Sequence, residues 1–382
     1  MTTPKIGVIG GGQLARMMAP AALNLGLDLS ILCEGPDVSS ARAVAHAPVG
    51  DYKDPEAVLA FARTVDVVTF DHEHVPQEIL QAMEAEGIQV HPGSSALRNA
   101  QDKLVMRRAV EALGLPNPLW AEATTVDDVL AFGDTNGWPI IAKTPRGGYD
   151  GKGVRVVSRD DAAGVQEWLE NSTVLLEEKV DFPRELSVLV ARNPSGEVRA
   201  WPLAHTIQVD GVCDEVIAPA QDVDDAVMLA AMETATRLAT ELQVTGVLAV
   251  ELFEAPGRGP GFIINELAMR PHNTGHWTQD GSYTSQFEQH LRAVIDWPLG
   301  ETAPLAGPTV MKNYLGGANQ DLHGAFAAAL ASDPAAKVHM YGKSVRPGRK
   351  IGHVNVVGQP GADVASLRER ATSVAGIIRD GA

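Results

Sequence analysis

The chain has 382 residues, enough for two or three domains, and its 45% hydrophobic and 21% charged residues are typical of a globular protein. A net charge of −17 disfavours general binding of nucleic acid or anionic membranes, so an anionic ligand would need local basic clusters. Two cysteines, Cys33 and Cys213, exclude a disulfide scaffold and a four-cysteine zinc site. With no signal-like start and no long apolar run, the sequence favours a cytoplasmic protein.

Residues 1–100 predict a doubly wound parallel sheet, because strand-like and helix-like patterns alternate along them. The predicted strands are 5–9, 27–33, 65–70 and 88–90, with helices at 13–25 and after Pro76. The first strand ends in three glycines at 10–12 and opens a helix. Together with Ala15 and Glu34, this nearly fits a dinucleotide-binding turn. A plain strand-to-helix turn without a ligand is the alternative.

Four polar residues, Asp71 to His74, follow the third predicted strand. They lie at the carboxyl end of a parallel sheet, where ligands commonly bind, so we expect ligand contacts there. His72 and His74 share one strand face, but the sequence offers no clear third ligand for zinc.

Residues 105–180 predict a small α+β unit with a glycine-rich loop. A helix over 102–113 precedes strands at 138–143, 154–157 and 174–179. Lys143 ends a strand, and the glycines at 147, 148, 151 and 153 let backbone N–H groups approach phosphate oxygens. We therefore predict a phosphate-covering loop, with a mobile surface hairpin as the alternative.

Residues 181–305 predict mainly strands, at 186–191, 198–203, 247–253 and 262–265, interrupted by a helix over 224–242. The segment 255–261 is typical of a hairpin loop, which would set Glu251 opposite Glu266. A carboxylate inside an apolar strand needs compensation, and oxygen ligands of this kind suit Mg²⁺. The alternative is that both glutamates face outward.

The loop after the second hairpin strand carries Arg270, His272 and His276, and such loops often carry function. The two histidines are a weak zinc pair, since Pro271 and Gly275 disfavour a helix. Residues 306–382, a segment expected to pack with 181–305, predict helices at 323–331 and 365–378. Between them, four cations at 343, 346, 349 and 350 form a local anion site or a solvated basic turn.

Five segments together resemble ATP-grasp ligases, and among these the family of N5-carboxyaminoimidazole ribonucleotide synthetases of purine biosynthesis. They are GGGQLARMM, FDHEHVP, GGYDGKG, INELAMRPHNTGHWT and VRPGRKIGHVN, and all lie between residue 7 and residue 356. The resemblance implies an ATP-grasp fold of mixed α/β and α+β type: a pre-ATP-grasp domain, a lid domain and a metal-binding domain. It implies a homodimer without nucleic-acid or membrane partners. The implied reaction is the carboxylation of 5-aminoimidazole ribonucleotide with ATP and bicarbonate through carboxyphosphate, with Mg²⁺ or Mn²⁺ as the metal ion.

The resemblance also assigns residues to the two halves of the site. Positions implied to bind ATP are Arg98, Lys143, Gly148, Tyr149, Asp150, Gly151, Lys152, Gly153, Glu177, Glu178, Lys179, Val180, Glu185, Gln208 (a histidine in some relatives), Asn265 and Glu266. Positions implied to bind the ribonucleotide and bicarbonate are Gln13, Glu73, Tyr149, Asp150, Arg270, His272, Asn273, Lys343, Arg346, Arg349 and Lys350. Glu251 and Glu266 are the implied metal ligands.

For catalysis, Lys143 would stabilise the transferring phosphoryl group, Arg270 would bind bicarbonate, and Asp150 or His272 would accept the amine proton. Three other functions remain candidates. One is an ATP-grasp ligase with another acceptor, one is a nicotinamide-dependent oxidoreductase built on the glycine turn, and one is a silent nucleotide-binding regulator.

Overall fold

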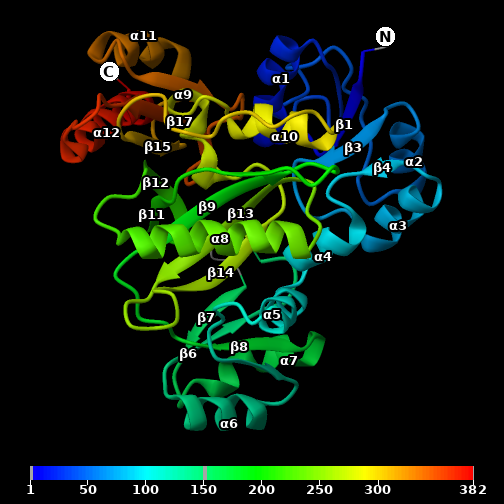
Figure 1. Cartoon of the computed structure of the whole chain (residues 1–382), viewed down its shortest axis with the longest axis vertical. Coiled ribbons are helices and arrows are strands. Elements are labelled where there is room, and N and C mark those ends of the chain that lie inside the picture. The colour runs from blue at the N-terminus through cyan, green and yellow to red at the C-terminus, as the bar shows by residue number, and fades with distance from the viewer. Residues whose placement is uncertain (1–2, 149–152, 382) are drawn as a thin grey trace.

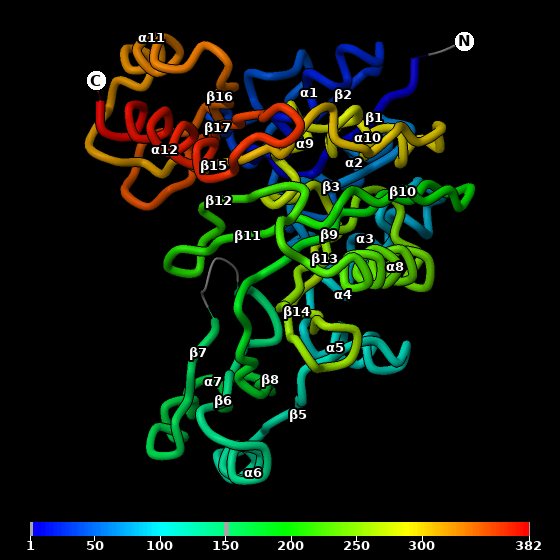
Figure 2. Tube along the Cα trace, turned by 60° about the vertical axis from the view of Figure 1, so that its left-hand side comes forward, coloured from blue at the N-terminus to red at the C-terminus, as the bar shows by residue number. Residues whose placement is uncertain are grey.

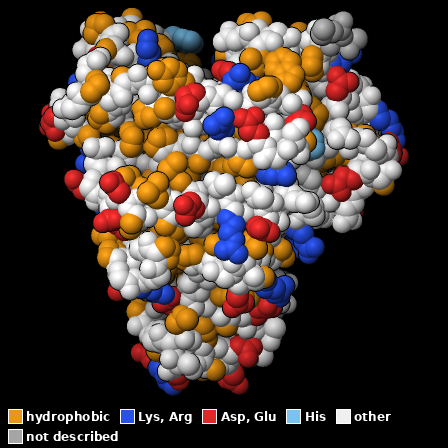
Figure 3. All heavy atoms as spheres, in the orientation of Figure 1, with side chains coloured by type: hydrophobic (Ala, Val, Ile, Leu, Met, Phe, Trp, Pro, Cys, Tyr) orange, Lys and Arg blue, Asp and Glu red, His pale blue; other side chains and the backbone are white. Residues whose placement is uncertain are grey.

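The structure is a computed structural model that describes residues 3–148 and 153–381. Three β-sheets organise it, and Figure 1 shows them as an upper right lobe, a central and upper left body, and a lower lobe. Among the described residues no helix is both long and apolar enough to cross a membrane. On the face drawn in Figure 3, lysine and arginine side chains are scattered among acidic ones and do not form one basic patch.

The N-terminal sheet has four parallel strands in the order β2-β1-β3-β4, which confirms the predicted parallel sheet. Its elements are β1 (Lys5–Ile9), α1 (Gln13–Leu25), β2 (Asp28–Leu32), α2 (Pro55–Ala62), β3 (Val67–Phe70), α3 (Gln77–Ala85) and β4 (Gln89–Val90), followed by α4 (Ser94–Gln101). Helix α1 ends where Gly26 takes a left-handed conformation, with φ of 68°, that other residues adopt at a cost.

The lower lobe is built on a second sheet, antiparallel and ordered β5-β8-β6-β7. Its elements are α5 (Lys103–Ala112), β5 (Trp120–Ala123), α6 (Val126–Asn136), β6 (Ile140–Lys143), β7 (Val154–Val157), the 3-10 turn η1 (Ala162–Val165), α7 (Gln166–Asn171) and β8 (Val174–Glu178). Helix α6 packs its apolar face on this sheet around Val129, Ile140 and Leu176.

The third sheet is antiparallel and forms the central body, in the order β14-β13-β9-β11-β12-β15-β17-β16, with β10 paired to β9. Its first part contains β9 (Glu185–Arg192), β10 (Val198–Ala200), β11 (Ala204–Val209), β12 (Val212–Ala218), α8 (Asp225–Glu241), β13 (Gly246–Glu254) and β14 (Phe262–Ala268). The segments that follow are η2 (Asn273–Gly275), α9 (Thr278–Gly281), α10 (Gln286–Val294), β15 (Thr309–Leu315), α11 (Leu322–Ser332), β16 (Lys337–Met340), β17 (Lys350–Val357) and α12 (Val364–Asp380).

The two faces of this sheet are covered differently, because side chains alternate along a strand. Leu248 and Val250 of β13 lie in the core cluster that includes residues of α8, the helix in front of the sheet in Figure 1. Val247 and Ala249 lie in the opposite cluster with Trp277. By the same alternation, Glu251 belongs to the second face, the one away from α8. In Figure 2 the lower lobe lies below the central body, and β7 lies below β11.

Candidate active site

The centre of the candidate site is the hairpin of β13 and β14. Glu251 pairs directly with Glu266 in the antiparallel register, as the sequence predicts. The register then shifts, so that Leu252 pairs with Ile264 and Asn265 is an additional residue on β14. Such a bulge re-aims side chains locally. It therefore groups Asn265 and Glu266 opposite Glu251 on one hairpin.

The environment of Glu251 fits a divalent cation. Burial raises the pKa of Glu251 to about 8, and the negative charges of Glu266 and Glu185 add to this effect. Across residues 3–148 and 153–381 no group of three or more His, Cys, Asp or Glu side chains could hold a metal. Two facing carboxylates suit Mg²⁺, which usually takes one or two protein carboxylates together with substrate phosphates.

Lys103 completes the hairpin's charged surroundings and is a residue that the sequence reasoning missed. Its Nζ lies 3.1 Å from Oε1 of Glu266 and donates to the Gly148 carbonyl at 3.4 Å. Arg98, the cation assigned from the resemblance, is exposed in the last turn of α4. Lys103 begins the next helix, α5. The positively charged side chain beside Glu266 therefore lies five residues after Arg98 in the sequence.

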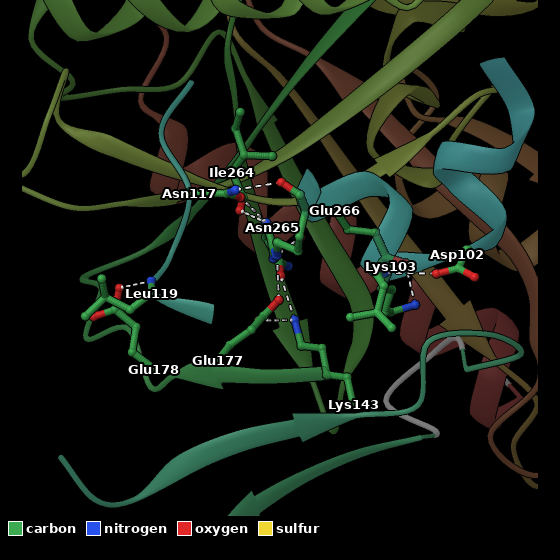
Figure 4. Close-up of polar contacts among 12 residues, drawn as sticks. Asp102, Lys103, Asn117, Leu119, Lys143, Glu177, Glu178, Ile264, Asn265 and Glu266 are labelled. Atoms are coloured by element: carbon green, nitrogen blue, oxygen red, sulfur yellow. Dashed lines mark hydrogen bonds and ion pairs between the residues drawn. The ribbon is translucent and has the colours of Figure 1, made fainter. Parts of the chain in front are cut away.

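Lys143 is held over the same hairpin from the lower lobe, as Figure 4 shows. Its Nζ lies 2.8 Å from Oε2 of Glu177 and donates to Oδ1 of Asn265 at 3.4 Å. Burial alone would raise the pKa of Glu177, but the charges of Lys143 and Arg107 lower it to about 2. Glu177 therefore stays ionised and keeps the lysine ammonium at the end of β6, facing β14.

The other residues assigned to ATP have varied surroundings. The carboxylate of Glu178 is paired with Arg258 at 2.6 Å, and Lys179 is paired with Asp181 at 2.9 Å. Val180 is buried in a small apolar cluster that includes Ala255 and Ile263. Glu185 begins β9, and a hydrogen bond with Gln208 opposes the rise in its pKa that burial causes.

The glycine loop is described only at its two ends. Gly148 accepts the hydrogen bond from Lys103, and Gly153 has a φ of +73°, where a Cβ would lie 2.3 Å from Oγ1 of Thr144. The return of the loop to β7 therefore requires glycine at 153. The assigned residues Tyr149, Asp150, Gly151 and Lys152 lie outside the described residues.

Arg270 forms a two-pronged ion pair with Glu73, although the two lie 197 positions apart. Nε donates to Oε2 at 2.6 Å and Nη2 donates to Oε1 at 3.3 Å. Burial would raise the pKa of Glu73, yet the charge and hydrogen bonds of Arg270 lower it to about 2. The structure thus joins the loop after β3 to the end of β14 at one point.

His272 lies between this pair and the hairpin carboxylates. Its Nδ1 is 3.0 Å from Oγ1 of Thr274 and 3.8 Å from Oε1 of Glu251. Burial, and then the nearby charge of Arg270, lower the pKa of His272 to about 3. The imidazole is therefore neutral at neutral pH and is a weak base in this environment.

A third group joins the N-terminal domain to the C-terminal strands. Nζ of Lys343 donates to Oε1 of Gln13, and the Gln13 amide donates to Oδ1 of Asn273 at 3.4 Å. Arg346 is exposed and Arg349 bonds to Ser344 within the same turn. Lys350 differs from these two arginines, because it is buried at the start of β17. Its positive charge partly opposes the rise in the pKa of Glu251.

The glycine turn at 10–12 does not present a free phosphate site. The N–H of Gly11 donates to Oε2 of Glu34 at 2.9 Å, and that of Ala15 donates to Oδ1 of Asp71 at 2.7 Å. A Cβ at Gly12 would lie 1.9 Å from Oδ2 of Asp71. Two carboxylates thus lie where a dinucleotide would place its pyrophosphate. This geometry removes the structural basis of the oxidoreductase hypothesis.

The pair of Glu73 and Arg270 predicts a loss of stability in acid. The folded pKa of Glu73, about 2, is below its ordinary value of 4.5, so its stabilising contribution is present above about pH 4.5 and is lost as the pH falls toward 2. We expect the free energy of unfolding by urea to fall between about pH 5 and about pH 3, and to fall less steeply in Glu73→Gln. Equal slopes in the two proteins would contradict this assignment.

The fold and site together define an ATP-grasp enzyme. The ATP-grasp domain family matches residues 108–287, the ribonucleotide synthetase pre-ATP-grasp domain matches 1–101, and the phosphoribosylaminoimidazole carboxylase C-terminal domain matches 309–367. The curated relatives include N5-carboxyaminoimidazole ribonucleotide synthases. The proteins of Corynebacterium ammoniagenes and Mycobacterium tuberculosis are 49% and 47% identical, covering 93% and 96% of this chain and 88% and 86% of theirs. The chain belongs to the N5-carboxyaminoimidazole ribonucleotide synthase family.

A solved structure of the same family supports this assignment. The N5-carboxyaminoimidazole synthase of Aspergillus clavatus, in complex with ADP and 5-aminoimidazole ribonucleotide, superposes with a TM-score of 0.87. It is 32% identical, and the match covers 99% of this chain and 98% of that one. The arrangement of three sheets described above is therefore shared with that structure.

Proposed function

We propose that this chain carboxylates 5-aminoimidazole ribonucleotide with ATP and bicarbonate, as its family name implies, at the β13–β14 hairpin and the surfaces that face it. The observation that carries the proposal is the direct pairing of Glu251 with Glu266 beside two lysines. A phosphoryl-transfer site requires carboxylates that bind a metal ion and positively charged side chains that bind the phosphates.

The nucleotide half of the site would lie between the lower lobe and the hairpin. Lys103 and Lys143 reach this space from different elements, and the loop at 148–153 begins beside them. Glu251 and Glu266 would hold Mg²⁺ or Mn²⁺, which would neutralise charge on the phosphates. The proposed adenine and ribose contacts are those of Glu177 to Val180, Glu185 and Gln208.

The first chemical step would transfer a phosphoryl group to bicarbonate. A bicarbonate oxygen attacks the γ-phosphorus, the bond to ADP breaks, and carboxyphosphate forms. Arg270 is suited to bind bicarbonate and carboxyphosphate, because a guanidinium fork matches their paired oxygens. Glu73 holds that guanidinium in place. Lys143 would stabilise the charge on the transferring group.

The second step would pass the carboxyl group to the exocyclic amine of the ribonucleotide. The amine nitrogen attacks the carboxyl carbon, phosphate leaves, and the nitrogen loses a proton. His272 and Asp150 are the candidate acceptors for that proton. His272 is neutral and its Nδ1 lies 3.8 Å from Oε1 of Glu251, but its low pKa makes it a weak base.

Lys343 is proposed to bind the phosphate of the ribonucleotide together with Arg346 and Arg349. We expect Lys343→Met to raise KM for 5-aminoimidazole ribonucleotide by about tenfold or more, which corresponds to losing one charge-assisted hydrogen bond. KM for ATP should change by less than about twofold. Steady-state kinetics with each substrate varied in turn will check this. A larger change in KM for ATP than in KM for the ribonucleotide would contradict the assignment of Lys343 to the ribonucleotide phosphate.

The proposed function has a direct test in ADP release with Mg²⁺ and ATP present. We expect rapid release only when 5-aminoimidazole ribonucleotide and bicarbonate are supplied together. Formate or amino acids in place of these substrates should not support it. Rapid ADP release with another acceptor, and none with the ribonucleotide, would assign the chain to a different ATP-grasp reaction.

The protein is also proposed to act as a homodimer, as the family resemblance implies. Light scattering of the purified protein on a sizing column should give twice the chain mass. A monomer at micromolar concentration would refute this part of the proposal without affecting the reaction.

A further inference from the structure

One buried side chain outside the assigned set contacts both halves of the nucleotide site. Arg107 of α5 is 0% exposed and lies among the lower lobe, the connector after α5, and the edge of the central sheet. Its Nε donates to Oε1 of Glu177 at 2.6 Å. Because the other oxygen of Glu177 holds Lys143, a single carboxylate joins the guanidinium to the phosphate-facing lysine.

The other side of the guanidinium is fixed to the bulge of β14. Nη1 donates to the carbonyl of Ile264 at 2.8 Å, and Nη2 donates to the carbonyl of Asn265 at 2.7 Å. Strand β14 is the last strand in the sheet order, so these carbonyls have no further strand to pair with. Buried carbonyls need partners, and Arg107 supplies them where the register shifts before Glu266.

The connector after α5 locks the arginine from a third direction. Nη1 also donates to Oδ1 of Asn117 at 3.1 Å, and Nδ2 of Asn117 donates back to the Arg107 carbonyl at 2.9 Å. Figure 4 shows Asn117 close to Ile264 and Asn265, with Glu177 and Lys143 below them. The connector also caps the strand edge, since the Ile264 N–H donates to the Pro116 carbonyl.

We propose that Arg107 is a positioning residue for phosphoryl transfer, which fixes Lys143 through Glu177 and fixes the orientation of Glu266 through the carbonyls of Ile264 and Asn265. This inference rests on the proposed function. Lysine cannot replace the arginine, because only a planar fork reaches a carboxylate, an amide oxygen and two carbonyls at once. The loss should therefore affect MgATP and spare the ribonucleotide.

The test compares Arg107→Lys and Asn117→Ala with Arg108→Lys. Arg108 is the neighbouring arginine of α5, but it forms an exposed pair with Glu122, so Arg108→Lys is the matched control. We expect Arg107→Lys to raise KM for MgATP by about 10- to 100-fold and to lower kcat, as losses of outer-sphere supporting groups do. KM for the ribonucleotide should change by less than about twofold. Asn117→Ala should show the same pattern more weakly, and Arg108→Lys should match the wild type.

A double-mutant cycle separates positioning from general destabilisation. MgADP affinity, measured by calorimetry, should fall in Arg107→Lys, and that fall should shrink in a Lys143→Met background because both changes act through one group. Additive losses, equal changes in both KM values, or unchanged kinetics in a folded Arg107→Lys and in Asn117→Ala would each overturn the proposal. ADP release by the wild type, measured in parallel, tests the proposed function separately.

Discussion

Glu266→Gln is expected to lower kcat by on the order of 10² to 10³-fold, the loss typical of removing one group that stabilises a charged transition state. The amide keeps the size of the side chain and still accepts a hydrogen bond from Lys103, but it removes one of the two charges that face each other on the hairpin. When turnover is measured against Mg²⁺ concentration, the variant should need a higher Mg²⁺ concentration than the wild type to reach half of its maximal rate.

The fold should survive this substitution. Glu266 contributes to the raised pKa of Glu251, so removing its charge relieves repulsion between two carboxylates. The free energy of unfolding without metal should therefore not fall. Glu254→Gln is the matched control, because Glu254 lies on the same hairpin and pairs with Arg184. Near-normal turnover in Glu266→Gln, or equal losses in both variants, would remove Glu266 from the metal role.

Arg270→Ala is expected to reduce turnover by on the order of 10³-fold, while MgADP affinity changes by less than about threefold. Three of the five N–H donors of Arg270 are used by Glu73 and the Pro271 carbonyl, which hold the guanidinium in place. Bicarbonate-dependent ADP release and calorimetric binding of MgADP are the two measurements.

This substitution also leaves a buried carboxylate without its partner, which costs about 3 to 5 kcal/mol when such a pair is broken. The double variant Glu73→Gln with Arg270→Met removes both charges. We expect it to recover most of the stability of the folded state and none of the turnover. Recovery of turnover together with stability would mean that Arg270 acts only on the fold.

The pairing of Glu251 with Glu266 on the β13–β14 hairpin could be predicted from the sequence because it depends on local patterns. Glu251 alternates with buried apolar residues, and a glycine- and proline-rich turn joins its strand to that of Glu266, so the pairing followed from strand geometry. The bulge at Asn265 could not be predicted, because a register shift depends on what contacts the strand edge. Here that contact is Arg107, which reaches the edge from a separate helix.

Sequence reasoning was weakest for residues whose contacts join distant parts of the chain. Lys103 meets Glu266 across 163 positions, and nothing in the local pattern of α5 indicates that contact. Lys350 was grouped with Arg346 and Arg349 as one basic turn. The structure buries it at the start of β17, whereas Arg346 in the preceding turn is exposed.

Some elements carried a local pattern that would have revealed them. Helix α6, which was not predicted, begins with a capping box between Thr125 and Asp128, and this motif is recognisable in the sequence. The order of the central sheet, in contrast, places β15 between β12 and β17 and so depends on pairings between distant segments. A single sequence without pairing information cannot supply such an order, and none of these three strands was predicted.

Binding of Mn²⁺, followed by its electron paramagnetic resonance spectrum in the presence of ADP, tests the role of the facing carboxylates most directly. We predict tight binding by the wild type and at least about a tenfold weaker affinity in both Glu251→Gln and Glu266→Gln, since each removes one ligand. Wild-type affinity in both variants would contradict the claim that this hairpin holds the divalent cation.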